Sequence, residues 1–504
     1  MFSKIKTTAK NSFLYSIGNI AGKMSGIILL PLYMIYLPAE MFGLYSLFEI
    51  TYQFINALTG MGIKVSLSRW YWDKEMEGQK KELFFSAFVF NLMMSVITIT
   101  ILFAGFNLLS VYLFKTEISN ELKVVFLLST FIRLVVDMPM ILLRVTHKAA
   151  TYTHHQLIQL VTFVATTSLF VAYYKLEILG IFLGFLISNG INFLMLIPYT
   201  LRNIKWNYKK QVVKEMLTYG FPLAMSNLIN LVLSMSDKVV ISIFATLKHV
   251  GNYALAFKIS NIVELVVVNS FMGAYVNIFF KGMDETGNER FFAKSFTYFI
   301  FILTIISMGL VLFIKDIIAF LIAIMPDKNQ DYLGSINLIP ILTLSIIFGG
   351  ARLMLVLPLQ RYKKTKIISI VSVSLGVSNL ILNVLLVPVF GSMGAAIATM
   401  VTQIAASSWL LQYNMRLDKT PYEVKKIAIM LGTGILLGSA GVFAPIGNIL
   451  IHFALNIMII MLWLTILYFT NFFEQVELMR LHQAWVKWKN PLSWKKNLSK
   501  EKNE

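Results

Sequence analysis

Apolar stretches about twenty residues long follow one another along almost all of this 504-residue chain. A helix rises 1.5 Å per residue, so roughly twenty apolar residues are needed to cross a bilayer core. Because 57% of the residues are hydrophobic and 14% are charged, a water-soluble core could not bury so much apolar surface. We therefore expect an all-α polytopic membrane protein with fourteen spans, at about 11–37, 43–67, 83–106, 121–145, 156–174, 179–200, 217–245, 251–280, 296–314, 335–359, 367–387, 395–415, 427–446 and 449–472.

Lys and Arg are distributed unevenly between the two sides of this predicted bundle. The connections on the side of both termini carry 32 of them, whereas the other side carries only Lys115, Lys123, Lys175, Lys248 and Lys328. Cytoplasmic loops characteristically hold such an excess, so we expect both termini in the cytoplasm. The net charge of +19 is then a consequence of membrane topology, and we expect no nucleic-acid partner. The chain has no cysteine, which excludes disulfides and thiolate metal sites.

A weak internal repeat relates two parts of the chain at an offset of 208 residues. GLYSL at 43–47 aligns with GNYAL at 251–255, and Asn19 aligns with Asn227. Spans one and two would then correspond to spans seven and eight, as in a parallel repeat about an axis along the membrane normal. We expect two six-helix lobes around a central cavity. The predicted organisation is an N-lobe at 1–200, a basic linker at 201–216, a C-lobe at 217–415, two extra spans within 416–472 and a cytoplasmic tail at 473–504.

The tail is expected to form a basic amphipathic helix at the membrane surface. Leu478, Leu481, Trp485 and Trp488 follow helical spacing and share one face, and lysines lie among them. Such a helix buries its apolar face at the headgroup boundary and is attracted to anionic lipids. Membrane lipids are therefore expected partners.

Charged residues inside the predicted spans are the strongest functional signal. Each costs about 2.5–3.5 kcal/mol at the centre of a spanning helix, so such residues face a protein interior or a wet cavity. They occur in both lobes, which predicts one cation-lined cavity that binds an anionic substrate. The expected substrate-binding cations are Lys23, Lys64, Arg133, Lys238, Lys258 and Arg352. The expected ion-coupling or charge-balancing acids are Glu49, Asp137, Asp237 and Glu264.

Several of these residues have alternative explanations that the sequence leaves open. Arg133 and Asp137 are four residues apart and can neutralise each other on one helix. Lys64 lies close to a predicted cytoplasmic end, where its side chain can reach the headgroups. Lys258, in the outer third of its span, can do the same on the other side.

Other polar residues are expected to have structural roles. Asp237 and Lys238 are adjacent, so their side chains diverge by about 100° and face different partners. Lys315 and Asp316 fall at the end of a predicted span and are expected at the interface. We expect no metal site, because the neighbouring histidines lie in one predicted cytoplasmic loop: His147, His154 and His155.

Three segments resemble the polysaccharide repeat-unit flippases (Wzx type) of the multidrug/oligosaccharidyl-lipid/polysaccharide exporter superfamily. They are PAEMFGLYSL at 38–47, SDKVVISIFATLKHVGNYALAFKI at 236–259 and NLILNVLLVPVFGSMGAAIAT at 379–399. The third is the most specific and is shared across that superfamily, drug exporters included. The resemblance covers about 11–415.

The resemblance implies a transporter and not an enzyme. Its substrate would be an undecaprenyl-pyrophosphate-linked oligosaccharide, moved by alternating access from the inner to the outer leaflet of the bacterial cytoplasmic membrane for O-antigen, capsule or exopolysaccharide synthesis. A cationic cavity is common in that family, and a polysaccharide polymerase and a chain-length regulator are implied partners. No cofactor is expected, although coupling to H⁺ or Na⁺ is consistent with the acids in the spans.

Three other functions remain as alternatives. A cation-coupled multidrug exporter of the same fold needs acids more than cations in its cavity, but here six basic residues face four acidic ones. A lipid II flippase favours arginine in its first span, where this chain has Lys23. A membrane polymerase or glycosyltransferase would need a large outer loop or a cytoplasmic carboxylate motif.

Overall fold

The computed structural model describes residues 18, 21, 22, 24–283, 285, 287–324, 330–417, 420–443 and 449–479. All regular secondary structure within these ranges is helical, and twelve of the described helices are long and apolar enough to cross a membrane. These twelve correspond to predicted spans three to fourteen. The first predicted span lies partly outside the described residues. The all-helical fold expected from the sequence is confirmed.

The prediction of the second span, 43–67, as one helix is wrong. The chain forms α3 (Ala39–Gly60) and α4 (Ile63–Trp70), separated by Met61 and Gly62, which have φ values of 40° and 81°. A Cβ atom on Gly62 would lie 2.0 Å from the carbonyl oxygen of Gly220 in α9 (Lys210–Phe244). Because glycine alone tolerates this backbone angle and this approach, the break lets α4 pack directly on α9.

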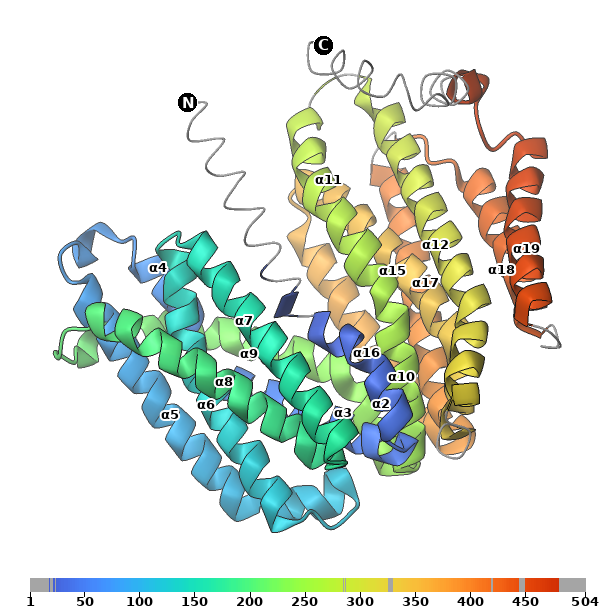
Figure 1. Ribbon diagram of the computed structural model, residues 1–504. Helices are drawn as coiled ribbons and strands as arrows, with labels where there is room; N and C mark the ends of the chain where they lie inside the picture. The colour runs from blue at the N-terminus through green and yellow to red at the C-terminus, as the bar shows by residue number, and fades with distance from the viewer. Residues whose placement is uncertain are drawn as a thin grey trace, which may run out of the picture. The chain divides into compact units, whose positions relative to one another are not determined.

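The first of two compact units contains residues 1–269 and 317–412. In one group of its helices, α6 and α7 both lie along α8, and α5 packs on α6 (Figure 1). In a second group, α10 packs on α15, and α9 packs on α16. Besides α3, α4 and α9, this unit contains α2 (Leu30–Tyr36), α5 (Lys80–Leu109), α6 (Asn120–Val145), α7 (Ala149–Ser168), α8 (Glu177–Arg202), α10 (Leu247–Val263), α14 (Leu333–Ile336), α15 (Leu338–Arg361), α16 (Thr365–Phe390) and most of α17 (Ser392–Leu417).

The two groups meet where the repeat-related helices α3 and α10 cross. A Cβ atom on Gly43 would lie 2.2 Å from the carbonyl oxygen of Leu247, and one on Gly251 would lie 1.8 Å from that of Ala39. The two glycines that the repeat aligns therefore face each other across one contact. Only a residue without a side chain permits this separation of the two backbones.

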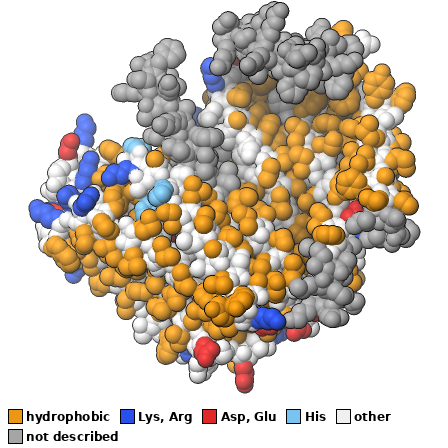
Figure 2. Space-filling model, in the orientation of Figure 1, with side chains coloured by type: hydrophobic (Ala, Val, Ile, Leu, Met, Phe, Trp, Pro, Cys, Tyr) orange, Lys and Arg blue, Asp and Glu red, His pale blue; other side chains and the backbone are white. Residues whose placement is uncertain are grey.

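Aromatic side chains fill the interior near this crossing. The ring of Phe48 lies 4.4 Å from that of Phe114, 4.7 Å from that of Phe126 and 5.2 Å from that of Phe182. Hydrophobic side chains also cover most of the visible outer face over α5, α6 and α8, whereas Lys and Arg gather near α4 (Figure 2). This distribution fits helices that face lipid along their length and water at their ends.

The second compact unit contains residues 270–316 and 413–504. Its helices are α11 (Asn269–Gly282), which begins at the unit boundary, most of α12 (Asn288–Ile324), α18 (Val424–Phe443) and α19 (Ile449–Phe469). The rings of Phe271 and Phe299 stack 4.5 Å apart between α11 and α12. The predicted tail helix depends on Leu481, Trp485 and Trp488, which lie outside the described residues.

Lys315 and Asp316, which are expected at the membrane interface, lie close to the end of the candidate span Asn288–Ile318. Because α12 continues to Ile324, Asp316 lies inside the unit and is only 6% exposed. Its carboxylate lies 2.6 Å from Nδ1 of His452 and accepts a hydrogen bond from Asn456, both on α19. These partners are more than 130 residues away in the sequence, so the apolar pattern of α12 alone did not reveal them.

Candidate functional site

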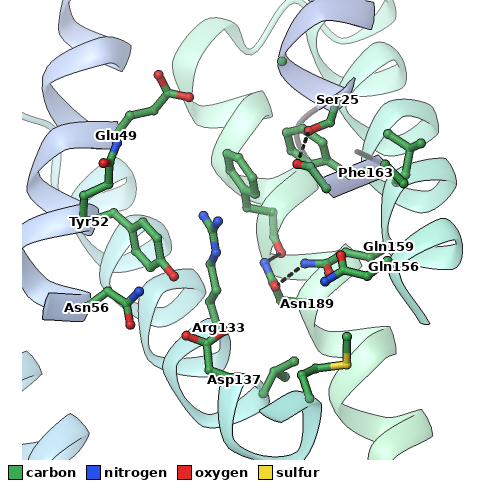
Figure 3. A pocket seen from close by; sticks show the side chains of 18 of the residues that line it. Ser25, Glu49, Tyr52, Asn56, Arg133, Asp137, Gln156, Gln159, Phe163 and Asn189 are labelled. Carbon is green, nitrogen blue, oxygen red and sulfur yellow. Dashed lines mark hydrogen bonds between the residues drawn. The ribbon is translucent and has the colours of Figure 1, made fainter. Parts of the chain in front are cut away.

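A cavity of about 1310 Å³ lies within the first unit. Residues of α3, α4, α6, α7, α8, α9 and α10 line it, together with residues at 21–27 and the turn that begins at Glu264. Pockets for drug-sized ligands usually measure about 300–1,000 Å³, so this one has room for a larger polar molecule. Figure 3 shows Arg133 reaching into the middle of the cavity, between Tyr52 and the side chains of Gln159 and Asn189.

Four of the six cations predicted from the sequence line this cavity: Lys64, Arg133, Lys238 and Lys258. Arg352 does not line it, and its Nε donates a hydrogen bond to Gln403, 3.2 Å away. Lys23 lies outside the described residues.

Two of the cavity lysines form ion pairs with predicted acids. Lys258 Nζ lies 2.8 Å from a carboxylate oxygen of Glu49, which also accepts a hydrogen bond from Tyr45. Lys64 Nζ lies 2.7 Å from the carboxylate of Asp137. Both lysines thus pair across the cavity between separate helices, and neither points away toward headgroups.

Arg133 and Lys238 differ from these lysines because neither forms an ion pair with any described residue. The Arg133 guanidinium lies 3.9 Å from the centre of the Tyr52 ring, and Lys238 Nζ lies 5.3 Å from that of Phe257. Asp137, the acid that could have neutralised Arg133, pairs with Lys64 instead. An aromatic face attracts a cation but does not cancel its charge. The cavity therefore contains two cations that can still bind an anion.

Two further basic groups that were not predicted from the sequence also lie at the cavity. Arg144, in the last turn of α6, and His147, whose ring stacks on Trp72, both line it. The same stretch was wrongly expected to be a loop as far as residue 155. In the structure α7 begins at Ala149, and His155 is buried and bound to Asn192. The run AATYTHHQL has no helix breaker, which could have signalled this start.

The four predicted acids have different surroundings. Glu49, Asp137 and Glu264 line the cavity, so among the described residues five Lys or Arg side chains and three acidic ones face it. Glu264 begins a π-helical turn, Glu264–Val268, of a kind often found at functional sites. Asp237 does not line the cavity, whereas Lys238 does, which agrees with the expectation that these adjacent side chains point in different directions. Asp237 accepts hydrogen bonds from Tyr253, Asn383 and Thr399.

One side of the cavity carries no charge. The side chains that α7 and α8 contribute to the lining are amides, hydroxyls, aromatic rings and one leucine. We call Gln156, Gln159, Ser188 and Asn189 the amide wall. Gln159 donates to Asn189, and Asn192 donates to Gln159 from behind, so the wall is held in place by hydrogen bonds. This wall could not be predicted from the sequence, because amides within spans are common packing residues.

Comparison with known proteins supplies a family and a fold. Residues 8–283, more than half of the chain, match the family described as polysaccharide biosynthesis protein. No curated protein sequence matches the chain. Among solved structures, the lipid II flippase MurJ in an inward closed conformation has a TM-score of 0.72 at 17% identity, covering 90% of this chain and 99% of that chain. An inward-facing multidrug resistance MATE family transporter of the MOP superfamily has a TM-score of 0.61 at 16% identity, covering 81% and 96%. At these identities the two similarities show a shared fold.

Proposed function

We propose, from the premise that the chain belongs to the polysaccharide biosynthesis protein family, that it is a flippase for lipid-linked oligosaccharides. Its substrate would be an undecaprenyl-pyrophosphate-linked repeat unit, moved from the inner to the outer leaflet of the bacterial cytoplasmic membrane. Both termini would lie in the cytoplasm, because the loops on that side carry 32 Lys and Arg against five on the other. A polysaccharide polymerase and a chain-length regulator are the partners that would use the product.

The observation that carries this proposal is the pair of cavity cations that form no ion pair with a described residue, Arg133 and Lys238. A charge inside the membrane is costly unless something compensates it. A diphosphate diester with about two negative charges would compensate both. A guanidinium can bind two phosphate oxygens at once, and an ammonium group supplies a point charge.

The membrane potential would favour the proposed direction of transport. Moving negative charge outward across an inside-negative membrane releases about 2.3 kcal/mol per charge per 100 mV. Alternating access would then require the contact of Gly43 with Gly251, at the predicted extracytoplasmic ends of α3 and α10, to open and close.

Coupling to H⁺ or Na⁺ is part of the proposal, and Asp237 is its best-placed acid. The carboxylate has no ion pair with a described residue, and it lies among oxygen and amide groups of Tyr253, Asn383 and Thr399. Such a group can exchange a proton or a small hard cation for these hydrogen bonds. If the coupling occurs here, Asp237→Asn should remove the dependence of transport on the ion gradient.

The test is transport by the purified protein in proteoliposomes, measured by the access of an impermeant glycosidase to the lipid-linked oligosaccharide. We expect Arg133→Gln and Lys238→Met each to slow transport at least about tenfold, the effect of losing one charge-assisted contact of about 1.5 kcal/mol or more. Lys248→Met is the matched control, because Lys248 pairs with Asp331 away from the cavity. Wild-type rates in both cavity variants would refute the proposal.

The choice of transported substrate separates a lipid II flippase and a multidrug exporter from the proposed function. Lipid II also carries a diphosphate, so a faster rate with lipid II than with the polysaccharide intermediate would identify a lipid II flippase. A multidrug exporter would move organic cations instead. Among the described residues, the excess of five Lys and Arg side chains over three acidic ones in the cavity disfavours such cargo.

A further inference from the structure

We propose that the amide wall is a subsite for uncharged sugar residues next to the diphosphate. This inference rests on the proposed function and adds to it the chemical class of the glycan. The cavity is divided by chemistry: the charged side chains come from α3, α4, α6, α9, α10 and the Glu264 turn, whereas α7 and α8 contribute none. A ligand with an anionic end and a neutral polar end matches this division.

Free hydrogen-bonding capacity is the first argument. A glutamine side chain offers two donors and an acceptor with two lone pairs. Gln159 uses one donor on Asn189 and one lone pair on Asn192, and Gln156 uses one donor on Tyr152. The carbonyl oxygen of Gln156 accepts no hydrogen bond from a described residue. Sugar hydroxyl and N-acetyl groups both donate and accept, so they can use the capacity that remains.

Rigid support is the second argument. Asn192 does not line the cavity and is fully buried, as is Asn189 within the wall, and His155, bound to Asn192, is only 6% exposed. A network of this kind holds the glutamine heads before any ligand arrives, which lowers the entropic cost of binding. Hydrocarbon is a poor occupant, because burying amides against it without hydrogen bonds is unfavourable.

Aromatic rings connect the wall with the cationic side. The Phe163 and Phe185 rings stack with centroids 4.1 Å apart, and Phe185 also lies 5.6 Å from the Arg133 guanidinium. Sugar rings present C–H faces that pack on such aromatic surfaces, while their hydroxyls reach the amides. A diphosphate at Arg133 would therefore place its first sugar residues along Phe185 and the amide wall.

Open space in the cavity also supports the proposal. A Cβ atom on Gly26 would meet no atom within 4 Å, and one on Gly22 would lie 3.4 Å from Gln156 Oε1. Both glycines line the cavity. A Cβ atom at Gly26 thus meets neither the amides nor the cations, so a larger side chain at this position tests the subsite by reducing the volume of the cavity.

The experiment measures the affinity of the full-length protein for two lipids. One is bare polyprenyl diphosphate, and the other carries a neutral disaccharide with an N-acetylhexosamine on the same diphosphate. We expect Gly26→Leu and Gln156→Ala to weaken binding of the glycosylated lipid about tenfold and that of the bare lipid less than about twofold. Gly190→Leu is the matched control, since Gly190 also has open space around it but does not line the cavity.

The outcomes separate this inference from the proposed function. If the wild-type protein binds neither lipid, the proposed function fails. If the wild-type protein binds both lipids, but the variants weaken the binding of both lipids equally or of neither lipid, the amide wall is not a glycan subsite. Binding of the bare lipid also reports that each variant is folded. A third lipid carries an acidic disaccharide on the same diphosphate. Tighter binding of this lipid than of the neutral one by the wild-type protein would likewise overturn the inference.

Discussion

Adding one methyl group to Gly251 tests whether the crossing of α3 and α10 closes the cavity in one state of the protein. A Cβ atom there would lie 1.8 Å from the carbonyl oxygen of Ala39, and real Cβ atoms essentially never come closer than 3.0 Å to another atom. The obstacle is backbone and not a flexible side chain. The two helices must therefore separate by about 1.2 Å to accept Gly251→Ala.

The expected cost can be estimated from packing. Inserting a methyl group into a close contact destabilises a structure by about 1–3 kcal/mol. If α3 and α10 touch here in only one of two alternating states, the whole cost falls on that state. The ratio of the two populations then shifts by about 5–150-fold toward the state in which the helices are apart.

Thiol labelling measures this shift directly, because the chain has no cysteine of its own. Gly26→Cys places a single thiol in the open part of the cavity, and an impermeant maleimide is added from outside the cell. We expect Gly251→Ala to raise the outside labelling rate at least about fivefold. Gly190→Ala, where the added methyl meets nothing within 4 Å, is the control. Equal labelling rates and equal melting temperatures for the two variants would refute the reasoning.

Three further predictions concern ion pairs and buried polar groups. In a double-mutant cycle of Glu49→Gln and Lys258→Met, we expect a coupling free energy of about 1–2 kcal/mol in thermal stability. The two side chains are 29% and 17% exposed, so this pair lies between a surface ion pair and a buried one. Additive effects of the two substitutions would contradict an ion pair. Asn456→Leu should lower the stability of the second unit by about 1–3 kcal/mol, because it leaves an oxygen of the buried Asp316 without its donor; an unchanged melting temperature would contradict this. The hydrogen bond from Lys294 lowers the pKa of Glu474, so the stability it contributes is complete above about pH 5 and is lost as the pH falls through the lowered pKa. Glu474→Gln should therefore flatten the pH dependence of the melting temperature below about pH 5, and an unchanged profile would count against this pair.

The internal repeat shows how far the sequence alone could lead. It aligned Gly43 with Gly251 and predicted that the two spans carrying them are equivalent. It could not show that the two glycines touch, because a repeat relates positions along a chain and not distances in space. The structure adds that the equivalent helices pack on each other through these residues.

The cations of the cavity show the same limit. Their energetic cost within apolar spans predicted that they face the interior, and four of the six line one cavity. Which of them are neutralised depends on the neighbouring helices. Lys64 pairs with Asp137, which is 73 residues away in the sequence, and Lys258 pairs with Glu49 at a separation of 209 residues. Arg133 forms no ion pair with a described residue, although Asp137 is only four residues from it.

The sequence by itself determined that this chain spans a membrane as a bundle of helices, because hydrophobic length and the cost of charge in hydrocarbon act locally along the chain. Only the tertiary structure decided which charges stay available and where an uncharged polar wall faces them. The reason is physical: ion pairs and amide networks form between side chains a few ångströms apart, and helix packing brings those side chains together from distant parts of the sequence.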